Sequence, residues 1–182
     1  AFYYYNGARE CYIDKKGEEQ AYAMLQIATV QQYVGDFYGS EETITDVLAN
    51  YEGTVYKPYL YNMLAVAYDK QRKFDDALQY YKKAYKSFED ARGKTLAQNN
   101  IGLIYQKKNE HEKAIQVLNP LLQNQNRKND RALILSNLGY SQFKLHRPEG
   151  YSNLLKSLQV TDSLKDVIAS ITTNIHLSEY FK

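Results

Sequence analysis

The chain of 182 residues contains one cysteine, three prolines and no tryptophan. The single thiol, Cys11, excludes an internal disulfide, and its apolar helical setting favours a packed thiol over a reactive one. No apolar run approaches the roughly 20 residues that a membrane-spanning helix needs. The first residues, AFYYYNG, lack the charged start and the cleavage site of a signal peptide. The N-terminal segment therefore assigns no compartment.

The chain also lacks an excess of positive or negative charge, since its formal net charge is only +2. This gives no electrostatic case for nucleic-acid binding, for which a strongly basic face is expected. The sequence contains no Gly-rich phosphate loop, nucleophile motif or zinc signature. His111, His146 and His176 do not converge with the spacing of metal ligands. We expect no catalytic residue, no cofactor and no metal site, and hence no enzyme.

What is present is a pair of helical patterns within the stretch Tyr59–Glu89, YLYNMLAVAYDKQRKFDDALQYYKKAYKSFE. A composition of 44% hydrophobic and 24% charged residues is that of a globular chain. Apolar residues recur at helical spacing on both sides of a short polar break. They are Tyr61, Leu64, Ala65 and Tyr68 before the break, and Ala77, Tyr81 and Ala84 after it. This predicts two amphipathic helices joined by a turn.

The two-helix pattern repeats every 37 residues. The small residue of each first helix falls at Ala28, Ala65, Gly102 and Gly139, and the next place in the series is His176. The start of each second helix falls at Ser40, Ala77, Ala114 and Tyr151. A constant period over most of a chain is the signature of a repeat protein.

We therefore expect an all-α fold, a right-handed α-solenoid of antiparallel helix pairs that is truncated mid-repeat at both ends. The expected units are the second helix of a truncated repeat over 1–14, repeats over 18–52, 57–92, 94–126 and 130–163, and a first helix over 165–182. Local signals predict a turn at Gly35-Asp36 and an N-cap at Ser40, followed by Glu41 and Glu42. The next repeat is expected to begin through Pro58 and to end at Gly93. Pro120 predicts an early stop of its helix, and Pro148 predicts a helix start.

Both terminal segments, AFYYYNGARECY and VIASITTNIHLSEYF, are apolar on one face. Because repeat arrays need polar outer faces at their ends, we interpret the chain as a fragment of a longer protein. The alternative, which is compatible, is that the open ends pair with another copy.

The motif resembles the tetratricopeptide repeat, whose pattern is W-x2-L-G-x2-Y, then A-x3-F, then P. The matching residues are Tyr61, Leu64, Ala65, Tyr68, Ala77 and Tyr81. The departures are Tyr61 for the Trp, Ala65 for the Gly and Glu89 for the Pro, and the lost Pro leaves the second helix free to run on. The period also exceeds the usual length of about 34 residues. The resemblance implies a scaffold that binds a protein or peptide partner.

Asparagines form the main candidate site. Asn100, Asn137 and Asn174 recur at the repeat period, while Asn62 and Asn99 lie one place earlier in their helices. First helices line the concave side of such arrays, and an amide offers a donor and an acceptor to a peptide backbone. The alternative is that each asparagine ties adjacent helices together. The other residues expected to face the groove are Tyr22, Leu25, Tyr33, Tyr59, Val66, Leu103, Tyr140, Phe143, Lys70, Lys107 and Lys144.

Aromatic and apolar groups with interspersed amides favour a peptide or a partner helix over a strongly acidic ligand. The chaperone-tail-binding kind of tetratricopeptide domain clamps a terminal carboxylate with Lys and Arg. That ligand is rejected here, because Leu25, Thr29, Met63 and Leu96 stand where the clamp would be sought.

The stretches QIATVQQYVGDFYGSEETITDVL, NMLAVAYDKQRKFDDALQYYKKA and SNLGYSQFKL resemble repeat regions of Bacteroidetes signalling proteins. In these, the array commonly precedes a membrane helix and a histidine kinase or helix-turn-helix output domain. The resemblance implies a sensory or assembly segment, exported to the periplasm, although a cytoplasmic one is compatible. Two alternatives stay open. One is a structural self-association module, and the other is part of an aspartate-phosphatase-type regulator, whose activity needs an additional helical bundle.

Overall fold

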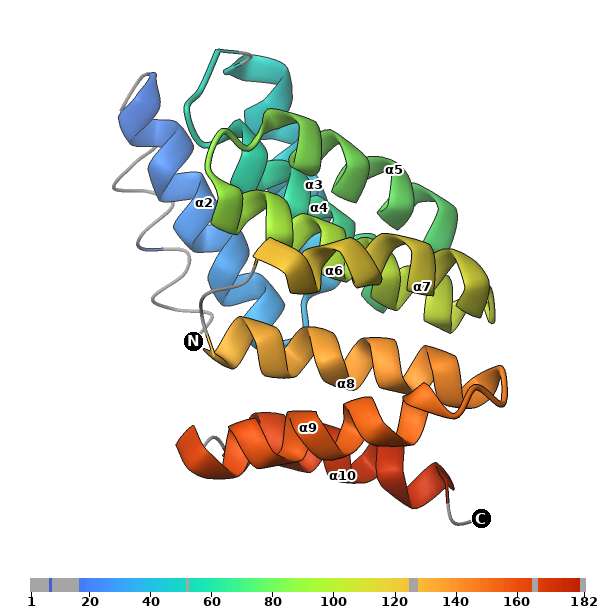
Figure 1. Ribbon diagram of the computed structural model, residues 1–182. Coiled ribbons are helices and arrows are strands. Elements are labelled where there is room, and N and C mark those ends of the chain that lie inside the picture. The colour runs from blue at the N-terminus through green and yellow to red at the C-terminus, as the bar shows by residue number, and fades with distance from the viewer. Residues whose placement is uncertain (1–6, 8–16, 52, 125–127, 165–166, 181–182) are drawn as a thin grey trace. The chain divides into compact units, whose positions relative to one another are not determined.

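A computed structural model describes residues 7, 17–51, 53–124, 128–164 and 167–180, and all regular structure within them is helical (Figure 1). The elements are α2 (Glu18–Tyr33), α3 (Phe37–Asn50), α4 (Lys57–Lys70), α5 (Phe74–Ser87), α6 (Ala91–Lys107), α7 (His111–Leu118), the 3-10 helix η1 (Asn119–Asn124), α8 (Lys128–Lys144), α9 (Glu149–Leu164) and α10 (Val167–Tyr180). The expected all-α repeat fold is confirmed. The helix expected over 1–14, and Cys11 with it, lie outside the described residues.

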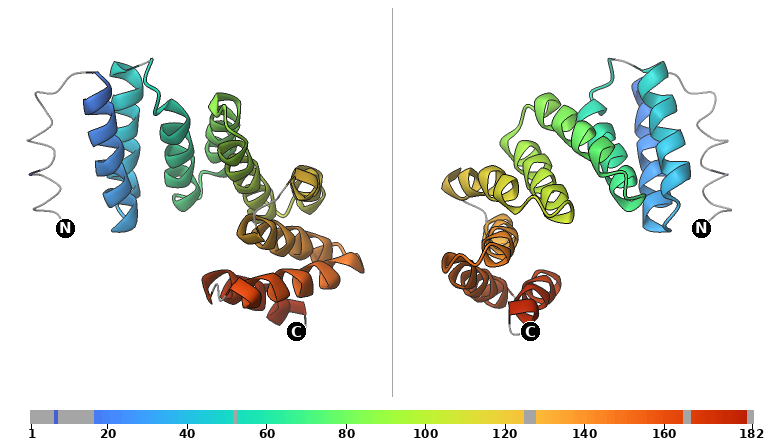
Figure 2. Two further views of the ribbon diagram at one scale, coloured as in Figure 1. Left: turned by 60° about the vertical axis from the view of Figure 1, so that its left-hand side comes forward. Right: turned by 90° about the vertical axis from the view of Figure 1, so that its right-hand side faces the viewer.

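The chain divides into two compact units, Ala1–Ala97 and Gln98–Lys182, and the division falls within α6. In the first unit α3 packs against both α2 and α4, and α4 packs against α5. In the second unit α8 packs against α7, α9 and α10 (Figure 2). Helices that are neighbours in sequence are thus neighbours in space, as in stacked two-helix repeats.

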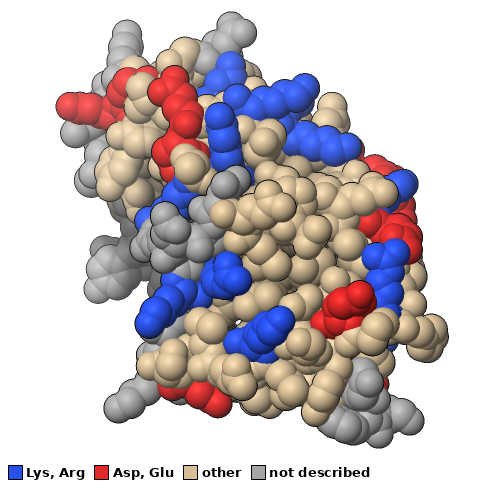
Figure 3. Space-filling model, in the orientation of Figure 1, with Lys and Arg blue, Asp and Glu red and all other residues tan. Residues whose placement is uncertain are grey.

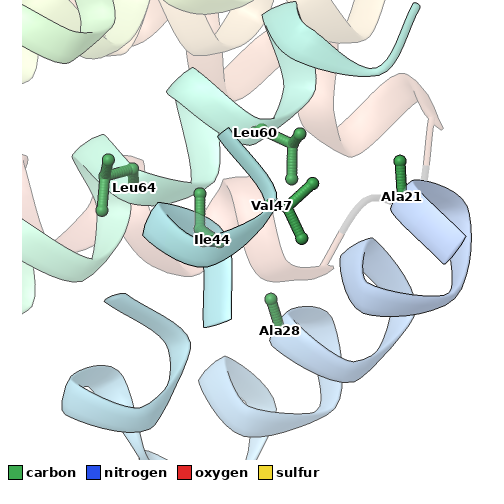
Figure 4. Packing of buried hydrophobic residues seen from close by; sticks show 6 residues of the cluster. All are labelled: Ala21, Ala28, Ile44, Val47, Leu60 and Leu64. Atoms are coloured by element: carbon green, nitrogen blue, oxygen red, sulfur yellow. The ribbon is translucent and has the colours of Figure 1, made fainter. Parts of the chain in front are cut away.

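The core of the first unit is built from three successive helices (Figure 4). Two alanines of α2 face aliphatic side chains of α3 and α4, and all six side chains are at most 1% exposed: Ala21, Ala28, Ile44, Val47, Leu60 and Leu64. Each buried aliphatic side chain contributes about 1.5–3 kcal/mol. The small alanines let α2 lie close to its neighbours.

The second unit brings its helices even closer, at glycines. A Cβ added to Gly102 would lie 2.7 Å from the Leu118 side chain, and one added to Gly139 would lie 2.9 Å from the backbone oxygen of Gly150. Gly150 lies one residue before Tyr151, which is 37 residues after Ala114. In α9 the backbone contact is therefore made by Gly150, while Tyr151 is half-buried.

The turns between paired helices share one backbone conformation that the sequence analysis recognised only at Gly35. The second residue after each first helix is left-handed: Gly35 (φ 86°), Arg72 (63°), Asn109 (58°) and His146 (55°). These residues are 37 positions apart. Each donates its N–H to the carbonyl three residues earlier at 2.8–3.1 Å, and the next residue donates to the carbonyl five residues earlier. This left-handed cap reverses the chain while satisfying the last carbonyls of the helix.

Helix α3 begins earlier than expected. Its N-cap is Asp36, whose carboxylate accepts a hydrogen bond from the N–H of Gly39 at 2.9 Å. Ser40, the expected cap, is fully buried and accepts a hydrogen bond from the amide of Gln32 at 3.0 Å. The expectation was wrong because Asp36 already provides the favoured carboxylate cap directly after the turn.

Gly93 also has a different role from the one expected. It lies in the first turn of α6 instead of ending a repeat, and its backbone packs so closely on Phe88 that a Cβ there would lie 2.2 Å from the ring. Pro120 does stop α7, which ends at Leu118 and continues as η1. Pro148 immediately precedes the first residue of α9. The repeat boundaries themselves stay a prediction.

We predict that Arg72→Gly stabilises the first unit by roughly 1 kcal/mol. Glycine avoids the cost of about 1–2 kcal/mol that an L-residue has in the left-handed region. Part of this gain is offset because glycine has more conformational freedom in the unfolded chain. Gly35→Ala should destabilise by a similar amount, and Asn109→Gly should change less because asparagine tolerates this conformation. Urea unfolding followed by circular dichroism measures all three. A less stable Arg72→Gly protein would contradict the assignment.

Candidate partner-binding surface

Large apolar side chains are exposed at one repeated place near the start of successive first helices. In the first unit these are Tyr22 on α2, Tyr59 on α4 and Leu96 on α6, exposed by 49%, 51% and 45%. They are 37 residues apart, and we call them the apolar row. Leu133 stands at the same place on α8 in the second unit and is 37% exposed. Leu96 and Leu133 were not predicted as site residues, although the spacing of Tyr22 and Tyr59, extended along the chain, leads to both.

Tyr59 is the central residue of the apolar row. Its ring meets the buried Phe88 edge-on, with centroids 5.1 Å apart. A hollow of about 400 Å³ opens beside it. Besides Tyr59 and Phe88 it is lined by Thr54, Val55, Lys57, Pro58, Ser87, Glu89 and Asp90. Volumes of about 300–1,000 Å³ suit ligand groups, so this hollow can accept a side chain of a partner.

The remaining expected residues of α4 lie further along the same helix. Asn62 and Val66 are half-buried, and Lys70 is exposed at the last position of α4. Asn62 has interactions within the protein, so its amide is not free. On α2, Leu25 is half-buried while Tyr33 is exposed. The structure thus places the expected residues of the first unit on first helices, with Tyr59 and Lys70 the exposed ones on α4.

The asparagines Asn99 and Asn137 are not on a surface. They are 3% and 1% exposed, and the Nδ2 of Asn137 donates to the Oδ1 of Asn99 at 2.9 Å. This bond joins α6 to α8 within the second unit. Asn99 and Asn137 therefore hold the two helices together and do not bind a partner as expected, because neither amide can reach a ligand.

Glutamines reinforce the same packing at a repeated place. Gln106 donates its amide to the backbone oxygen of Asn137 at 2.5 Å and to the Ser141 hydroxyl at 2.8 Å. Gln32, two repeats earlier, donates to the backbone oxygen of Met63 at 2.7 Å. Both bonds span 31 residues. The recurrence of Gln at these positions was the signal for a helix-to-helix bond that the sequence analysis did not use.

The other members of the asparagine series differ from one another. Asn100 is half-buried and has interactions within the protein, while Asn174 is exposed and contacts only its own helix in a long 3.4 Å bond to Ser170. Nearby on α6, Leu103 is half-buried and Lys107 is exposed. The structure therefore does not bring the asparagines together as one binding row.

Two expected residues at the end of α8 hold α10 in place. The ring of Tyr140 stacks on that of His176 with centroids 4.5 Å apart, and the Lys144 ammonium pairs with Glu179 at 2.7 Å. The Tyr140 hydroxyl also donates to Glu179 at 3.3 Å. Phe143 is half-buried, with the Lys144 ammonium 5.7 Å from its ring. These contacts are internal, so Tyr140 and Lys144 are already engaged.

Hydroxyl groups complete the attachment of α10. Thr173 contacts Ser157 at 3.1 Å and Ser136 at 3.2 Å, and Ser136 contacts the Nδ1 of His176 at 3.0 Å. Burial lowers the pKa of His176; Lys144 acts in the same direction and Glu179 opposes it. Burial and Lys144 likewise lower the pKa of His111, which meets Tyr140 edge-on.

Neither metal chemistry nor membrane insertion is built into these helices. Among the described residues, no three His, Cys, Asp or Glu side chains gather as a metal site would require. Across the same part of the chain, none of the helices combines the length and the hydropathy of a membrane crossing.

Stacked helix pairs, a repeated left-handed cap and an exposed apolar place define a helical-repeat protein. The chain belongs to the tetratricopeptide repeat family, whose profile matches residues 25–92 and 62–130. The resemblance expected from the motif is confirmed at the level of this family. Its arrays are typical scaffolds of protein–protein interaction and are generally not enzymes.

Solved structures share this fold at low sequence identity. A crystal structure of MamA is 14% identical with a TM-score of 0.69, covering 89% of this chain and 87% of that one. Aspartyl phosphate phosphatase F from Bacillus subtilis is 18% identical with a TM-score of 0.81, covering 91% of this chain but 46% of that one. Pseudomonas aeruginosa pilF is 16% identical with a TM-score of 0.64, covering 97% and 78%. At these identities the likeness shows the fold alone. No curated protein matches the chain in sequence.

We predict that Asn99→Ala and Asn137→Ala each destabilise the second unit by roughly 1–3 kcal/mol, because each leaves a buried amide without its partner. The double variant should lose less than the sum of the two. Asn174→Ala, on an exposed member of the series, should stay within about 0.5 kcal/mol of the parent. Denaturant unfolding of the four proteins measures the coupling. Additive losses would show that the pair does not interact.

We also predict that acidification weakens the second unit. The lowered pKa values of His111 and His176 mean that the folded state favours neutral imidazole. The unfolded chain takes up these protons near pH 6.5, so stability falls as the pH drops through about 6.5 and levels off once the folded-state histidines titrate. Thermal melts between about pH 7.5 and 5 measure the slope. His176→Gln should flatten it; His146→Gln, on an exposed turn, is the control substitution.

Proposed function

We propose that this chain is a protein- or peptide-binding module, in which the apolar row contacts the partner. The observation that carries the proposal is that Tyr22, Tyr59 and Leu96 expose large apolar side chains at the same repeated place. A single exposed apolar residue is ordinary on a protein surface. Recurrence at one place of successive helices gives a partner a regularly spaced set of contacts.

The hollow beside Tyr59 would hold one apolar side chain of the partner, and the row would contact the residues on either side of it. Asn62, Val66 and Lys70, further along α4, extend this surface. In the second unit, taken by itself, the residues proposed to contact a partner are Asn100, Leu103, Lys107, Leu133 and Phe143, with Asn174 on α10. The buried Asn99 and Asn137 are left out.

Surface charge is compatible with a protein partner. Lys and Arg side chains and Asp and Glu side chains both occur on the face drawn in Figure 3, in keeping with a net charge of +2. A partner with mixed polar and apolar side chains suits such a surface. No strong Coulombic attraction to nucleic acid is expected from this balance.

At the level of the whole protein, we propose that the module is the sensory or assembly segment of a larger bacterial signalling protein. The resemblance of three stretches to Bacteroidetes signalling arrays supports this, and an exported location follows from the same resemblance. A self-association module without a peptide ligand is the first alternative. A phosphatase-type regulator is the second alternative: aspartyl phosphate phosphatase F shares the fold, but this chain covers 46% of that protein.

The test is a cross-linked pull-down from lysate of the source organism with the parent chain and Tyr59→Lys. We expect Tyr59→Lys to lose the captured partner by about tenfold or more, because a charge replaces the central apolar contact. Tyr85→Lys is the matched control, since Tyr85 is a 38%-exposed tyrosine of a second helix, α5.

Equal capture by the parent and Tyr59→Lys would remove the apolar row from the proposal. No captured partner, together with a concentration-dependent mass, would favour self-association. Dephosphorylation of a phosphorylated receiver domain by the parent chain would favour the phosphatase-type alternative.

A further inference from the structure

The turn between α2 and α3 differs from its three counterparts in a systematic way. Tyr33 ends α2 where the later first helices end in Lys70, Lys107 and Lys144. Tyr38 lies at the start of α3 where the later helices carry Asp75, Glu112 and Glu149. Two tyrosines therefore take the places of a cation and an anion that recur in the other turns.

These tyrosines are among the most exposed aromatic residues of the described chain. Tyr33 is 92% exposed and Tyr38 is 72% exposed, and Val34 between them is 55% exposed. The residues at the corresponding Lys and acidic places are exposed as well. Since charged side chains serve at the same places in the other turns, the tyrosines are not needed to form the turn. Because their rings stay in contact with water, they gain little hydrophobic stabilisation from folding.

The sequence of the α2–α3 helix pair carries charge of one sign, although the Lys73 side chain of the next turn also lies near this turn. From residue 17 to residue 56 the chain carries seven Asp and Glu residues and no Lys or Arg, although its overall net charge is +2. Glu42, one helical turn after Tyr38, is exposed and stands where the later repeats have Gln79, Gln116 and Asn153. Asp36, also exposed, lies within the turn itself. Carboxylates therefore accompany the exposed rings.

A cation already lies near one of these rings. The Lys73 ammonium, from the next turn, is 5.8 Å from the centre of the Tyr38 ring and 3.5 Å from the Glu41 carboxylate. A ring face beside a carboxylate is an arrangement that attracts guanidinium and ammonium groups. The internal contact shows that the ring is accessible to a cation from outside its own helix pair.

We propose that the α2–α3 turn, with Tyr33, Val34, Tyr38 and Glu42, is a second interaction surface that binds a basic segment of a protein partner. Arginine or lysine side chains of the segment stack on the tyrosine rings and pair with Glu42 and Asp36, while apolar residues between them contact Val34. This surface is distinct from the apolar row, so it neither requires nor implies the partner proposed above.

The test uses a fluorescein-labelled probe, acetyl-Arg-Leu-Arg-Leu-Arg-amide, and a counterpart with Glu in place of each Arg. Anisotropy titrations with the full chain should show saturable binding of the basic probe only. Raising the salt from about 50 to 500 mM should weaken it, since the charges are exposed. The decisive variant is Tyr33→Lys, Tyr38→Asp, which copies the next turn and leaves the net charge unchanged. It should bind the basic probe at least about tenfold more weakly, because two cation–ring contacts are lost.

Two further variants separate the sources of binding. Glu42→Gln introduces the residue type found at this place in the next repeat. It should weaken probe binding severalfold, because it removes one carboxylate. Tyr59→Lys, in the apolar row, should leave probe binding unchanged, and the double tyrosine variant should leave capture by the apolar row unchanged. Circular dichroism melts confirm that each variant is folded.

The proposal is overturned if the basic probe does not bind, if the Glu probe binds equally well, or if the double tyrosine variant binds like the parent. If Tyr59→Lys weakened probe binding equally, the probe would bind to the apolar row, and the proposal would again be overturned. A parent dimer that the double variant dissociates, without probe binding, would assign this surface to a second copy of the chain instead.

Discussion

Close approach of helix backbones at one small residue per helix is the constraint on which the rest of the structure depends. Gly139 touches the backbone of Gly150, and Ala28 and Ala65 are fully buried at the corresponding places. Such contacts remove Cβ atoms from the interface and let flanking aliphatic side chains interdigitate at the density of a protein interior. The left-handed caps act with them, because a cap of fixed length sets which residues of the second helix meet the small residue. The same packing requirement therefore explains both the fold and the repeat period.

The sequence was sufficient for the fold because this rule leaves a periodic trace. Alanine and glycine every 37 residues predicted helix pairs that the structure contains. The errors fell where one residue of register mattered. A shift of one residue rotates a side chain by about 100° around a helix, which is why Gly150 and not Tyr151 makes the close contact. Two helix starts were misplaced for a related reason. The carboxylates of Asp36 and Asp90 accept hydrogen bonds from the N–H groups of Gly39 and Gly93 at 2.9 and 2.8 Å, and local pattern does not rank such caps against a nearby serine or glycine.

The candidate site was less predictable because a period identifies equivalent positions without saying which way each one faces. Asn137 and Asn174 occupy the same place in the series, yet one is buried in a bond to Asn99 and the other is exposed. Burial of an amide is decided by the neighbouring helix, which supplies the partner atom or does not. The apolar row shows the converse: its residues differ in type, two Tyr and one Leu, but share exposure. Recurring exposure, which only the structure gives, is therefore a better guide to a binding surface than a recurring residue type.

Repeats also offer an internal comparison that single domains lack. Where four turns share one backbone conformation, the residues that all four retain are those that the turn requires, and the residues that differ are free for other roles. The left-handed cap and its two hydrogen bonds are retained in every turn. The aromatic pair Tyr33 and Tyr38 is confined to one turn, within a stretch without any basic residue. Because the exposed rings add little to the packing of the turn, the aromatic exception is best explained by recognition, and the carboxylates beside it set the sign of the partner's charge.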